Sequence, residues 1–412
     1  MALDTPVNEA TADVPVIPRI VSVDDHVIEP PGVWIDRLPA QHREAAPHVE
    51  RRTIGKVVYR DGGFVTLEGD GVETDCWIYG DVVKPIRSNI ASAGLERDAM
   101  GLDPIDYDTM RKGCWEPVAR LADMDLNHVE ASLSFPSFPR FCGQEFLEAP
   151  DKDLSLLCVR AYNDWMVEEW SATDPSRLIP LCIIPLWDVD LAVEEIRRNA
   201  ARGVRAVTFS EIPFLLGLPS IHDKNGYWDP FFRVCEETGT VVCMHIGSSS
   251  SMQTMSPDAP PAVNIALSFN NAMNSMSDYL FSGVLVRFPR LKLAYSEGQI
   301  GWIPYILERV DVVWEQHRGW SGVGKDSIPE PPSTYYYRNM YGCFFSDFHG
   351  LKSLDEVGVD NVTFETDYPH TDSSWPDTLA LAERLFVGID NDVVRKIVRG
   401  NAISMLGLDL EP

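Results

Sequence analysis

The sequence has few basic residues and no apolar segment long enough to cross a membrane. Its 412 residues include 62 acidic but only 35 basic side chains, which gives a formal net charge of -27. Such a surface repels phosphate backbones and anionic lipid head groups, so we expect neither nucleic acid nor membrane as a partner. Crossing a bilayer would need roughly 20 consecutive apolar residues. A small-molecule substrate is the remaining expectation, and it can be anionic if a buried cation dominates the local field.

Several familiar functional motifs are also absent. The eight cysteines are scattered without any Cys-x-x-Cys pair, and a buried free thiol is the simple interpretation of Cys182 and Cys243. The first 18 residues contain no basic residue and do not resemble a signal peptide, so we expect a cytoplasmic protein with a mobile N-terminal arm at 1–18. There is no Gly-x-Ser-x-Gly elbow, no Walker loop and no Gly-x-Gly-x-x-Gly after a strand. These absences leave serine-hydrolase and nucleotide-binding chemistry without support.

Short apolar runs that alternate with helical patterns fill most of the chain. The runs lie at 19–24, 129–135, 178–185, 204–209, 240–245, 291–296, 341–346 and 361–366. They are nearly continuous in Val, Ile, Leu, Phe and Cys, as is typical of strands covered on both faces. Helical patterns between them include 154–171, 188–201, 228–238, 262–287 and 301–316. This alternation predicts an α/β protein, a (β/α)8 TIM barrel that spans residues 19–408.

One connection is far longer than a barrel loop usually is. Residues 36–118, between the first and second predicted strands, read as an insertion, within which 56–67 predicts a β-hairpin with an Asp-Gly turn. An insertion on such a connection should lie over the carboxyl ends of the strands, as a lid or as a subunit contact. Together with the apolar loop around 335–337, it favours a homo-oligomer, most simply a dimer.

Three predicted strands end in side chains that bind metals. Asp24 and His26 end the first strand, His245 ends the fifth, and Asp367 follows the eighth. A parallel barrel gathers its carboxyl strand ends, and Asp and His provide ligands for a divalent ion. Each residue also has an ordinary explanation, as a surface Asp, a core histidine or a helix N-cap. Their joint occurrence at three strand ends is what favours a metal site.

Three further strand-end residues are candidates with open alternatives. Glu297, after the sixth strand, can be a fourth ligand or a base, or it can satisfy amides at the next helix start. Arg140, after the second strand, can pair with a substrate carboxylate or remain solvated. His349, after the seventh strand, can contact the substrate or shuttle a proton, or be an ordinary loop histidine.

These motifs resemble the amidohydrolase superfamily, specifically the amidohydrolase-2 group, which also contains aromatic-acid decarboxylases. The resemblance covers residues 19 to 408 and rests on the segments 23–30, 244–247, 297–304, 365–370 and 396–402. It implies a distorted barrel whose metal is held by Asp24, His26, His245 and Asp367.

The chain departs from the group's pattern at two positions. Asp24 and Glu297 stand where many members have histidine, which makes the site harder and more anionic and leaves iron, zinc and manganese open. No position on the fourth strand, 204–209, fits a carbamylated lysine, so one ion is the default and two remain possible.

Two enzymatic functions fit these ligands equally well. The main expectation is hydrolysis of an amide, ester or thioester of a bulky, partly apolar or aromatic small molecule by a metal-activated water. In it, His245 holds the ion and Asp367 transfers the proton. The alternative is a metal-dependent, non-oxidative decarboxylase of an aromatic or unsaturated carboxylic acid. A catalytically silent barrel is a third reading, against which the joint presence of the four ligands argues.

Overall fold

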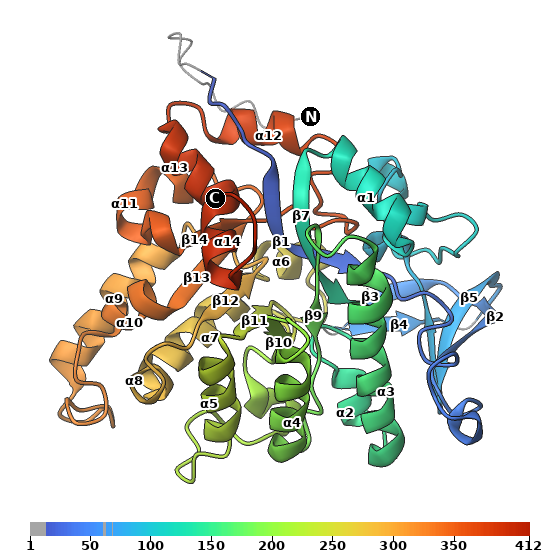
Figure 1. Ribbon diagram of the computed structural model, residues 1–412, viewed down its shortest axis with the longest axis horizontal. Coiled ribbons are helices and arrows are strands. Elements are labelled where there is room, and N and C mark those ends of the chain that lie inside the picture. The colour runs from blue at the N-terminus through green and yellow to red at the C-terminus, as the bar shows by residue number, and fades with distance from the viewer. Residues whose placement is uncertain (1–13, 61–62, 68) are drawn as a thin grey trace.

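Two parallel β-sheets, which we call arcs, form the centre of the fold (Figure 1). The computed structural model describes residues 14–60, 63–67 and 69–412. The first arc has the order β1-β7-β8 and the second the order β14-β13-β12-β11-β10-β9, with every pairing parallel. The strands are β1 (Ile20–Val27), β7 (Val129–Pro136), β8 (Leu178–Ile179), β9 (Leu181–Cys182), β10 (Ala206–Thr208), β11 (Val241–His245), β12 (Leu293–Ser296), β13 (Met340–Phe344) and β14 (Val362–Phe364). They occur where the sequence predicts strands, and the mixed α/β content is confirmed.

The two arcs approach each other at both ends. Only Pro180 separates β8 from β9, and because proline has no N–H for a ladder, the strand predicted at 178–185 is divided into two short pieces. At the opposite end, the Asp367 backbone N–H donates to the Asp24 carbonyl oxygen over 2.9 Å. This bond places the carboxyl end of β1 beside the chain that leaves β14.

Helices pack outside the strands (Figure 1). They are α1 (Pro117–Leu126), α2 (Gln144–Glu148), α3 (Lys152–Trp165), α4 (Val189–Ala200), α5 (Asp229–Thr238), α6 (Pro261–Ala266), α7 (Asn270–Phe281), α8 (Val284–Arg287), α9 (Ile303–His317), α10 (Pro332–Asn339), α11 (Leu354–Val357), α12 (Thr378–Leu385), α13 (Asn391–Arg395) and α14 (Asn401–Leu406). The single helix predicted at 262–287 is three helices, and Gly283, with a φ of 73°, ends the second of them. Among the described residues, no helix combines the length and apolar character needed to cross a membrane.

Strand β11 shows why the sequence reads as a continuous apolar run. Val241 and Cys243 belong to one buried cluster, whereas Val242 and Met244 belong to another that includes the surrounding helices. Successive side chains alternate between the two faces of a strand, so both faces here are covered by protein. His245, two residues beyond Cys243, continues the inner face at the strand's carboxyl end.

An irregularity in β1 brings its polar residues to the same inner face. Val21 and Val23 pack in the inner cluster that contains Val241, and the pairing of β1 with β7 shifts register between Ser22 and Asp25. An extra residue in one strand reverses the alternation of side chains beyond it. Asp24 and His26 can therefore follow Val21 and Val23 on the inner side of the strand.

Two small antiparallel sheets lie between β1 and α1, within the predicted insertion. One contains β2 (His48–Ile54), β5 (Val72–Tyr79) and β6 (Val82–Pro85), and the other pairs β3 (Val57–Arg60) with β4 (Gly63–Thr66). The predicted hairpin corresponds to β3 and β4, and its turn at 61–62 is outside the described residues. Beyond β6, the segment 88–92 contacts the loop after β14, where the Ser92 N–H donates to the Pro369 oxygen over 2.8 Å.

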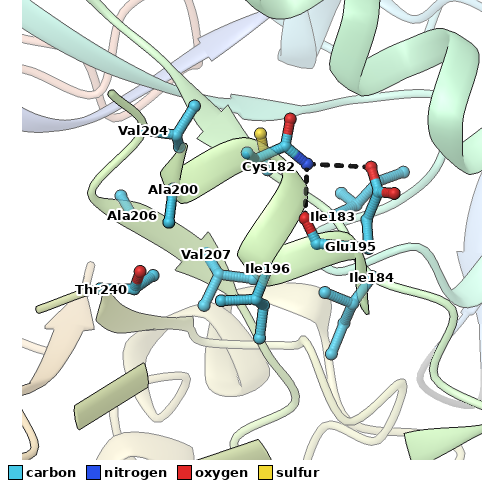
Figure 2. Close-up of a pocket in the computed structure, with 11 residues that line it drawn as sticks. Cys182, Ile183, Ile184, Glu195, Ile196, Ala200, Val204, Ala206, Val207 and Thr240 are labelled. Carbon is cyan, nitrogen blue, oxygen red and sulfur yellow. Dashed lines mark hydrogen bonds between the residues drawn. The ribbon is translucent and has the colours of Figure 1, made fainter. Parts of the chain in front are cut away.

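A small void lies between α4 and the strands β9 and β10 (Figure 2). Asp188 is the N-cap of helix α4, and its side chain accepts hydrogen bonds from the N–H groups of residues 190 and 191. Its buried face includes Ile196, which lines the void beside Val207. The residues that line this void include none of the predicted metal ligands.

Shortening Ile196 should therefore enlarge an existing space instead of allowing its walls to collapse. We expect Ile196→Ala to lower the free energy of unfolding by about 3 kcal/mol, measured by urea denaturation. The matched control is Ile265→Ala on α6, where the isoleucine is 63% exposed, and its effect should stay within about 0.5 kcal/mol. Equal effects in the two variants would contradict this account of the core.

Candidate metal centre

The structure brings five predicted metal ligands to one place. The His26 Nε2 atom lies 3.6 Å from Asp24 Oδ1 and 3.3 Å from Asp367 Oδ1. The His245 Nε2 atom lies 3.5 Å from Asp24 Oδ2 and 3.3 Å from Glu297 Oε2. The side chains of Asp24, His26, His245 and Asp367 are at most 1% exposed, and that of Glu297 is 17% exposed. The four chain segments thus meet in a nearly dry cluster.

The spacing within this cluster is that of ligands around an ion. Two donor atoms at normal zinc distances from a shared ion lie roughly 3.0–3.4 Å apart. Among the described residues, no hydrogen bond satisfies the Nε2 atoms of His26 and His245 or the carboxylate oxygens of Asp24 and Asp367, although all are buried. Leaving so many buried polar atoms unsatisfied is costly, and a divalent cation would satisfy them together. The residues present therefore fit a divalent metal, and carboxylate with imidazole suits iron, zinc or manganese.

The orientation of His245 supports the same interpretation. Its Nδ1 atom lies 2.6 Å from the carbonyl oxygen of Ile246, so this nitrogen carries the proton and Nε2 is left with a free lone pair. Burial lowers the pKa of His245 to about 4 and that of His26 well below its usual value. Both imidazoles are therefore neutral at pH 7, which is the form that binds metals.

The carboxyl groups experience a strong mutual field. Burial, followed by neighbouring carboxylates, raises the pKa values of Asp24 and Glu297 well above normal, and burial raises that of Glu365 to about 8. Burial would also raise the pKa of Asp367, but His370 and His26 hold it below its usual range. A bound cation would relieve the repulsion among these groups, so its binding should release protons.

Two of the candidate ligand carboxylates lie on unusual backbone. Asp367 has a φ of 50° and Glu297 a φ of 57°, in the left-handed region that residues other than glycine seldom occupy. Such a conformation costs about 1 kcal/mol or more and is common at functional sites. Here it turns the chain sharply just after β14 and β12, where the side chains enter the cluster.

Two buried side chains of opposite charge, Asp25 and Arg120, hold the chain around the ligand candidates. Asp25 accepts hydrogen bonds from the Thr366 Oγ1 atom over 2.6 Å and from the Tyr368 N–H over 3.0 Å. Arg120, with no exposed surface, donates to the His26 carbonyl oxygen over 2.5 Å, and its guanidinium stacks on Tyr368 at 4.3 Å. The pair therefore ties β1 to the loop after β14, on which Asp367 is carried.

Aromatic rings form one wall of the centre. Phe141 stacks on His245 with ring centroids 4.1 Å apart and an angle of 11° between the planes. Phe135 lies 5.2 Å from His245 and 6.0 Å from His26. On the other side of His26, the ring of His370 stacks at 3.5 Å. The side chains around the ligands are thus flat and largely apolar.

The two predicted substrate-binding residues are placed differently. Arg140 lies next to Phe141 in the chain, but it donates to Glu148 Oε1 over 2.7 Å and also to the Ser250 hydroxyl. His349 is exposed at the N-cap of a short 3-10 helix (Gly350–Ser353), and no contact within the described residues joins it to the ligands. A role for either residue in substrate binding stays a prediction.

Sequence reasoning missed several residues of the centre. Asp25 and His370 lie within the segments 23–30 and 365–370, next to or three residues from a candidate ligand, but the sequence pattern assigns neither of them a role. Arg120 sits in a helix far from any motif, and Phe141 follows a run of Phe and Pro that reads as ordinary core. Side chains alternate along a strand, so Asp25, between Asp24 and His26, is expected to face away from them. This is the only signal in the sequence that points to a separate role for Asp25.

Another buried carboxyl group supports the loop that follows His245. Glu211 Oε1 accepts hydrogen bonds from the Gly247 N–H over 2.9 Å, the Ser249 hydroxyl over 2.8 Å and the Asn271 amide over 2.9 Å. Burial raises the pKa of Glu211 to about 7. The carboxyl group therefore joins the ends of β10 and β11 to helix α7.

The chain is similar in sequence to a known protein family and to curated relatives. A sequence model described as Amidohydrolase matches residues 67–408. A gamma-resorcylate decarboxylase of Rhizobium sp. (strain MTP-10005) is 23% identical over 345 residues, which cover 74% of this chain and 94% of that protein.

Two solved structures share the fold. An amidohydrolase from Mycobacterium avium subsp. paratuberculosis K-10 has a TM-score of 0.70 at 21% identity, covering 95% of this chain and 100% of that one. A dihydroxybenzoic acid decarboxylase from Polaromonas sp. JS666, with bound manganese and the inhibitor 2-nitroresorcinol, has a TM-score of 0.58 at 16% identity. This match covers 96% of this chain and 98% of that one.

The role of the buried Arg120 can be tested by removing its charge. We expect Arg120→Met to lower the free energy of unfolding by about 3–5 kcal/mol, because the carbonyl oxygens of Gly113 and His26 would lose their donor and the buried Asp25 would lose the nearby positive charge. The variant should also retain less manganese after dialysis, since His26 and the loop after β14 lose a shared anchor. Urea denaturation in a chelator and elemental analysis measure the two effects. Arg290→Met, at a side chain that is 73% exposed, is the control and should change neither.

The pKa of Glu211 gives a prediction about pH. A carboxyl group whose pKa rises from 4.5 when unfolded to about 7 when folded binds its proton more tightly in the folded state. Stability is then lost as the pH rises from below the unfolded pKa through the folded one, by about 3 kcal/mol. We expect the wild type to lose about this much more stability than Glu211→Gln between pH 4.5 and 8, measured by denaturation without metal. Parallel pH profiles would show that the group does not titrate in this range.

Proposed function

The chain belongs to the amidohydrolase family, and from that premise we propose that it is a metal-dependent, non-oxidative decarboxylase of a hydroxylated aromatic carboxylic acid. The main support is the buried cluster of candidate ligands, which is lined by Phe135, Phe141 and the stacked imidazoles. A flat aromatic ring fits such walls, and a desolvated carboxylate loses carbon dioxide more readily than a hydrated one. The matched relative that acts on gamma-resorcylate supports this choice.

Hydrolysis, the main expectation from the sequence, has less support. It uses the same ligands, but the matched relatives are decarboxylases, and the aromatic wall leaves no assigned group for a leaving amine or alcohol. Decarboxylation would also give the buried Asp367 carboxylate a role as proton carrier at a site that bulk water does not reach. Decarboxylation is therefore the function that we propose.

We assign the metal to Asp24, His26, His245 and Asp367, with Glu297 at the more exposed side. When bound, the ion would hold the substrate carboxylate and a neighbouring hydroxyl and stabilise negative charge on them. One ion is the simplest occupancy, and iron, zinc and manganese all suit the donors. Arg140 and His349 remain our candidates for contacts to the outer part of the substrate.

In the proposed reaction, Asp367 carries the proton. His26 and His370 hold the pKa of Asp367 low, so it starts ionised and can accept the proton of the substrate hydroxyl. It then delivers this proton to the ring carbon that bears the carboxylate. The bond between ring and carboxylate breaks, its electron pair forms the new C–H bond, and carbon dioxide leaves. Solvent finally returns a proton to the product oxygen.

We further infer that the two arcs close into a single (β/α)8 barrel spanning 19–408. The bond from Asp367 to Asp24 and the one-residue gap at Pro180 support closure at both ends. Residues 36–118 would act as a lid on this barrel, and 1–18 as an arm, of which 1–13 are outside the described residues. A cytoplasmic homodimer stays our expectation for the assembled protein.

The proposal can be tested with hydroxybenzoates labelled with carbon-13 at the carboxyl group. Manganese-loaded protein in heavy water should release labelled carbon dioxide and place one deuterium on the vacated ring carbon, detected by mass spectrometry and proton NMR. Asp367→Asn should lower kcat by about 10³-fold, because the proton carrier is lost. Asp360→Asn, at a side chain that is 75% exposed, is the matched control and should retain full activity.

Failure would take a recognisable form. If no hydroxybenzoate loses carbon dioxide while acyl esters or amides are cleaved with incorporation of oxygen from water, the protein is a hydrolase that uses the same ligands. Normal turnover by Asp367→Asn would remove Asp367 from either mechanism.

A further inference from the structure

Glu29 is a buried carboxylate near the metal centre that the proposed reaction does not use. It follows His26 by three residues in the chain, and its side chain has no exposed surface. Its Oε1 atom accepts a hydrogen bond from the Ser137 N–H over 2.9 Å, and its Oε2 atom accepts one from the Phe138 N–H over 2.8 Å. Withdrawing a carboxylate from water is costly, and two peptide donors of the loop after β7 offset that cost. The end of β1 is therefore joined to the start of this loop.

The Phe138 peptide group is held by opposite charges on its two sides. Its N–H faces the Glu29 carboxylate, and its carbonyl oxygen accepts a hydrogen bond from the Lys84 Nζ atom over 3.1 Å. Lys84 belongs to β6 of the insertion, and its Nζ atom also lies 3.4 Å from Glu145 Oε2. Hydrogen bonds to charged groups are the strong ones, so this peptide has one preferred orientation.

The same loop turns sharply before it reaches Phe141. The Arg140 N–H donates to the Ser137 carbonyl oxygen over 3.2 Å, and Arg140 has a φ of 64°, in the left-handed region. The carbonyl oxygen of Phe141 accepts a hydrogen bond from the Thr208 hydroxyl over 2.7 Å. The turn 137–141 is thus fixed at its start by a buried carboxylate and at its end by this hydroxyl.

The turn determines how Phe141 faces the metal centre. The ring is stacked on His245 with centroids 4.1 Å apart, and it presents its plane at 70° to the ring of His26. A Cβ atom at Gly247 would come within 3.2 Å of the Phe141 ring, so the backbone leaves little space on that side. Phe141 is only partly buried, and a bound molecule can therefore reach it.

We propose that Glu29 is a positioning residue for the substrate: through the turn 137–141 it fixes the plane of Phe141, and the fixed ring selects flat aromatic acids over puckered ones. The inference rests on the proposed function, because it concerns the molecule that the centre would take. An aromatic face held in one orientation stacks on a flat ring with little loss of freedom. A face that could tilt would admit thicker molecules equally well. Glu29 therefore acts on the choice of substrate and not on retention of the ion.

Glu29→Gln is the informative substitution, because it preserves the size of the side chain but not its acceptors. A carboxylate accepts through both oxygens, whereas glutamine has one acceptor oxygen and an NH2 group that would face a peptide N–H. The matched control is Glu195→Gln on α4. Glu195 is 1% exposed and accepts hydrogen bonds from the amides of Asn163 and Asn199 over 2.7 and 2.9 Å. The control removes a buried carboxylate of the same kind outside the turn.

The first measurement follows the Phe141 ring itself. With 4-fluorophenylalanine at position 141 of the zinc-loaded protein, fluorine NMR should give a resonance that the stacked His245 ring displaces from its value in the unfolded chain. At pH 8, above the pKa of about 7 to which burial raises Glu29, the Glu29→Gln resonance should move toward the unfolded value or broaden. Lys84→Met, which frees the same peptide from its carbonyl side, should act in the same direction and is the second variant. Glu195→Gln should leave the resonance unchanged.

The second measurement compares two probes that carry the same carboxylate and neighbouring hydroxyl. Salicylate has a flat ring, and 2-hydroxycyclohexanecarboxylate has a puckered one. Isothermal titration of the zinc-loaded wild type should show tighter binding of salicylate. Glu29→Gln should reduce this preference about 10-fold at unchanged zinc content, and Glu195→Gln should keep it. When Phe141→Leu has already removed the ring, Glu29→Gln should reduce the preference no further.

An unchanged fluorine resonance in both Glu29→Gln and Lys84→Met would overturn the positioning role. A displaced resonance with an unchanged preference would overturn the role in selection, because the turn would then hold Phe141 without consequence for the ligand. If the wild type binds neither probe, the proposed function fails together with selection, whereas the fluorine spectrum still decides whether Glu29 holds Phe141. The two failures are therefore distinguishable.

Discussion

The desolvation of charged and polar ligands at the strand ends is the constraint on which the rest of the structure depends. Asp24, His26, His245 and Asp367 are almost completely shielded from water, yet their facing atoms have no hydrogen-bond partners among the described residues. Water would stabilise these atoms well, so the fold must hold them in place against their own hydration. The apolar strands beneath the site and the buried pair of Asp25 and Arg120 provide that restraint.

This restraint also explains why the ligands occupy strained or irregular backbone. The register shift in β1 turns Asp24 and His26 inward, and the left-handed conformation of Asp367 bends the chain immediately after β14. A regular strand would continue in the same direction and alternate its side chains without interruption. The strands hold the backbone rigid, and the irregular positions orient the side chains. A rigid scaffold can in this way direct several candidate ligands to one point.

The sequence predicts the strands and the candidate ligands for one reason and misses the supporting residues for another. Apolar runs such as 240–245 are visible because both faces of the strand are buried, and an acid or histidine at the end of such a run stands out. Arg120 and Phe141 carry no such contrast, since a helical arginine and a phenylalanine among prolines are ordinary in most surroundings. The division of the strand at 178–185 could have been read from Pro180, whereas the bulge in β1 depends on its pairing with β7 and has no local signal. His370 lies within the segment 365–370, but its closeness to His26 depends on how two distant strands meet.

The hydrogen bond from Ser92 to Pro369 joins positions 277 residues apart in the chain, one near the small sheets and one beside the ligands. Binding free energies are reciprocal: if an ion at the centre favours one arrangement of this contact, that arrangement favours the ion by the same amount. In that case, the fraction of sites that hold a cation and the fraction of molecules in which the segment 88–92 keeps this contact would change together. A molecule that bound one arrangement of this segment more tightly than another would then change how tightly the chain keeps its ion, without touching a ligand.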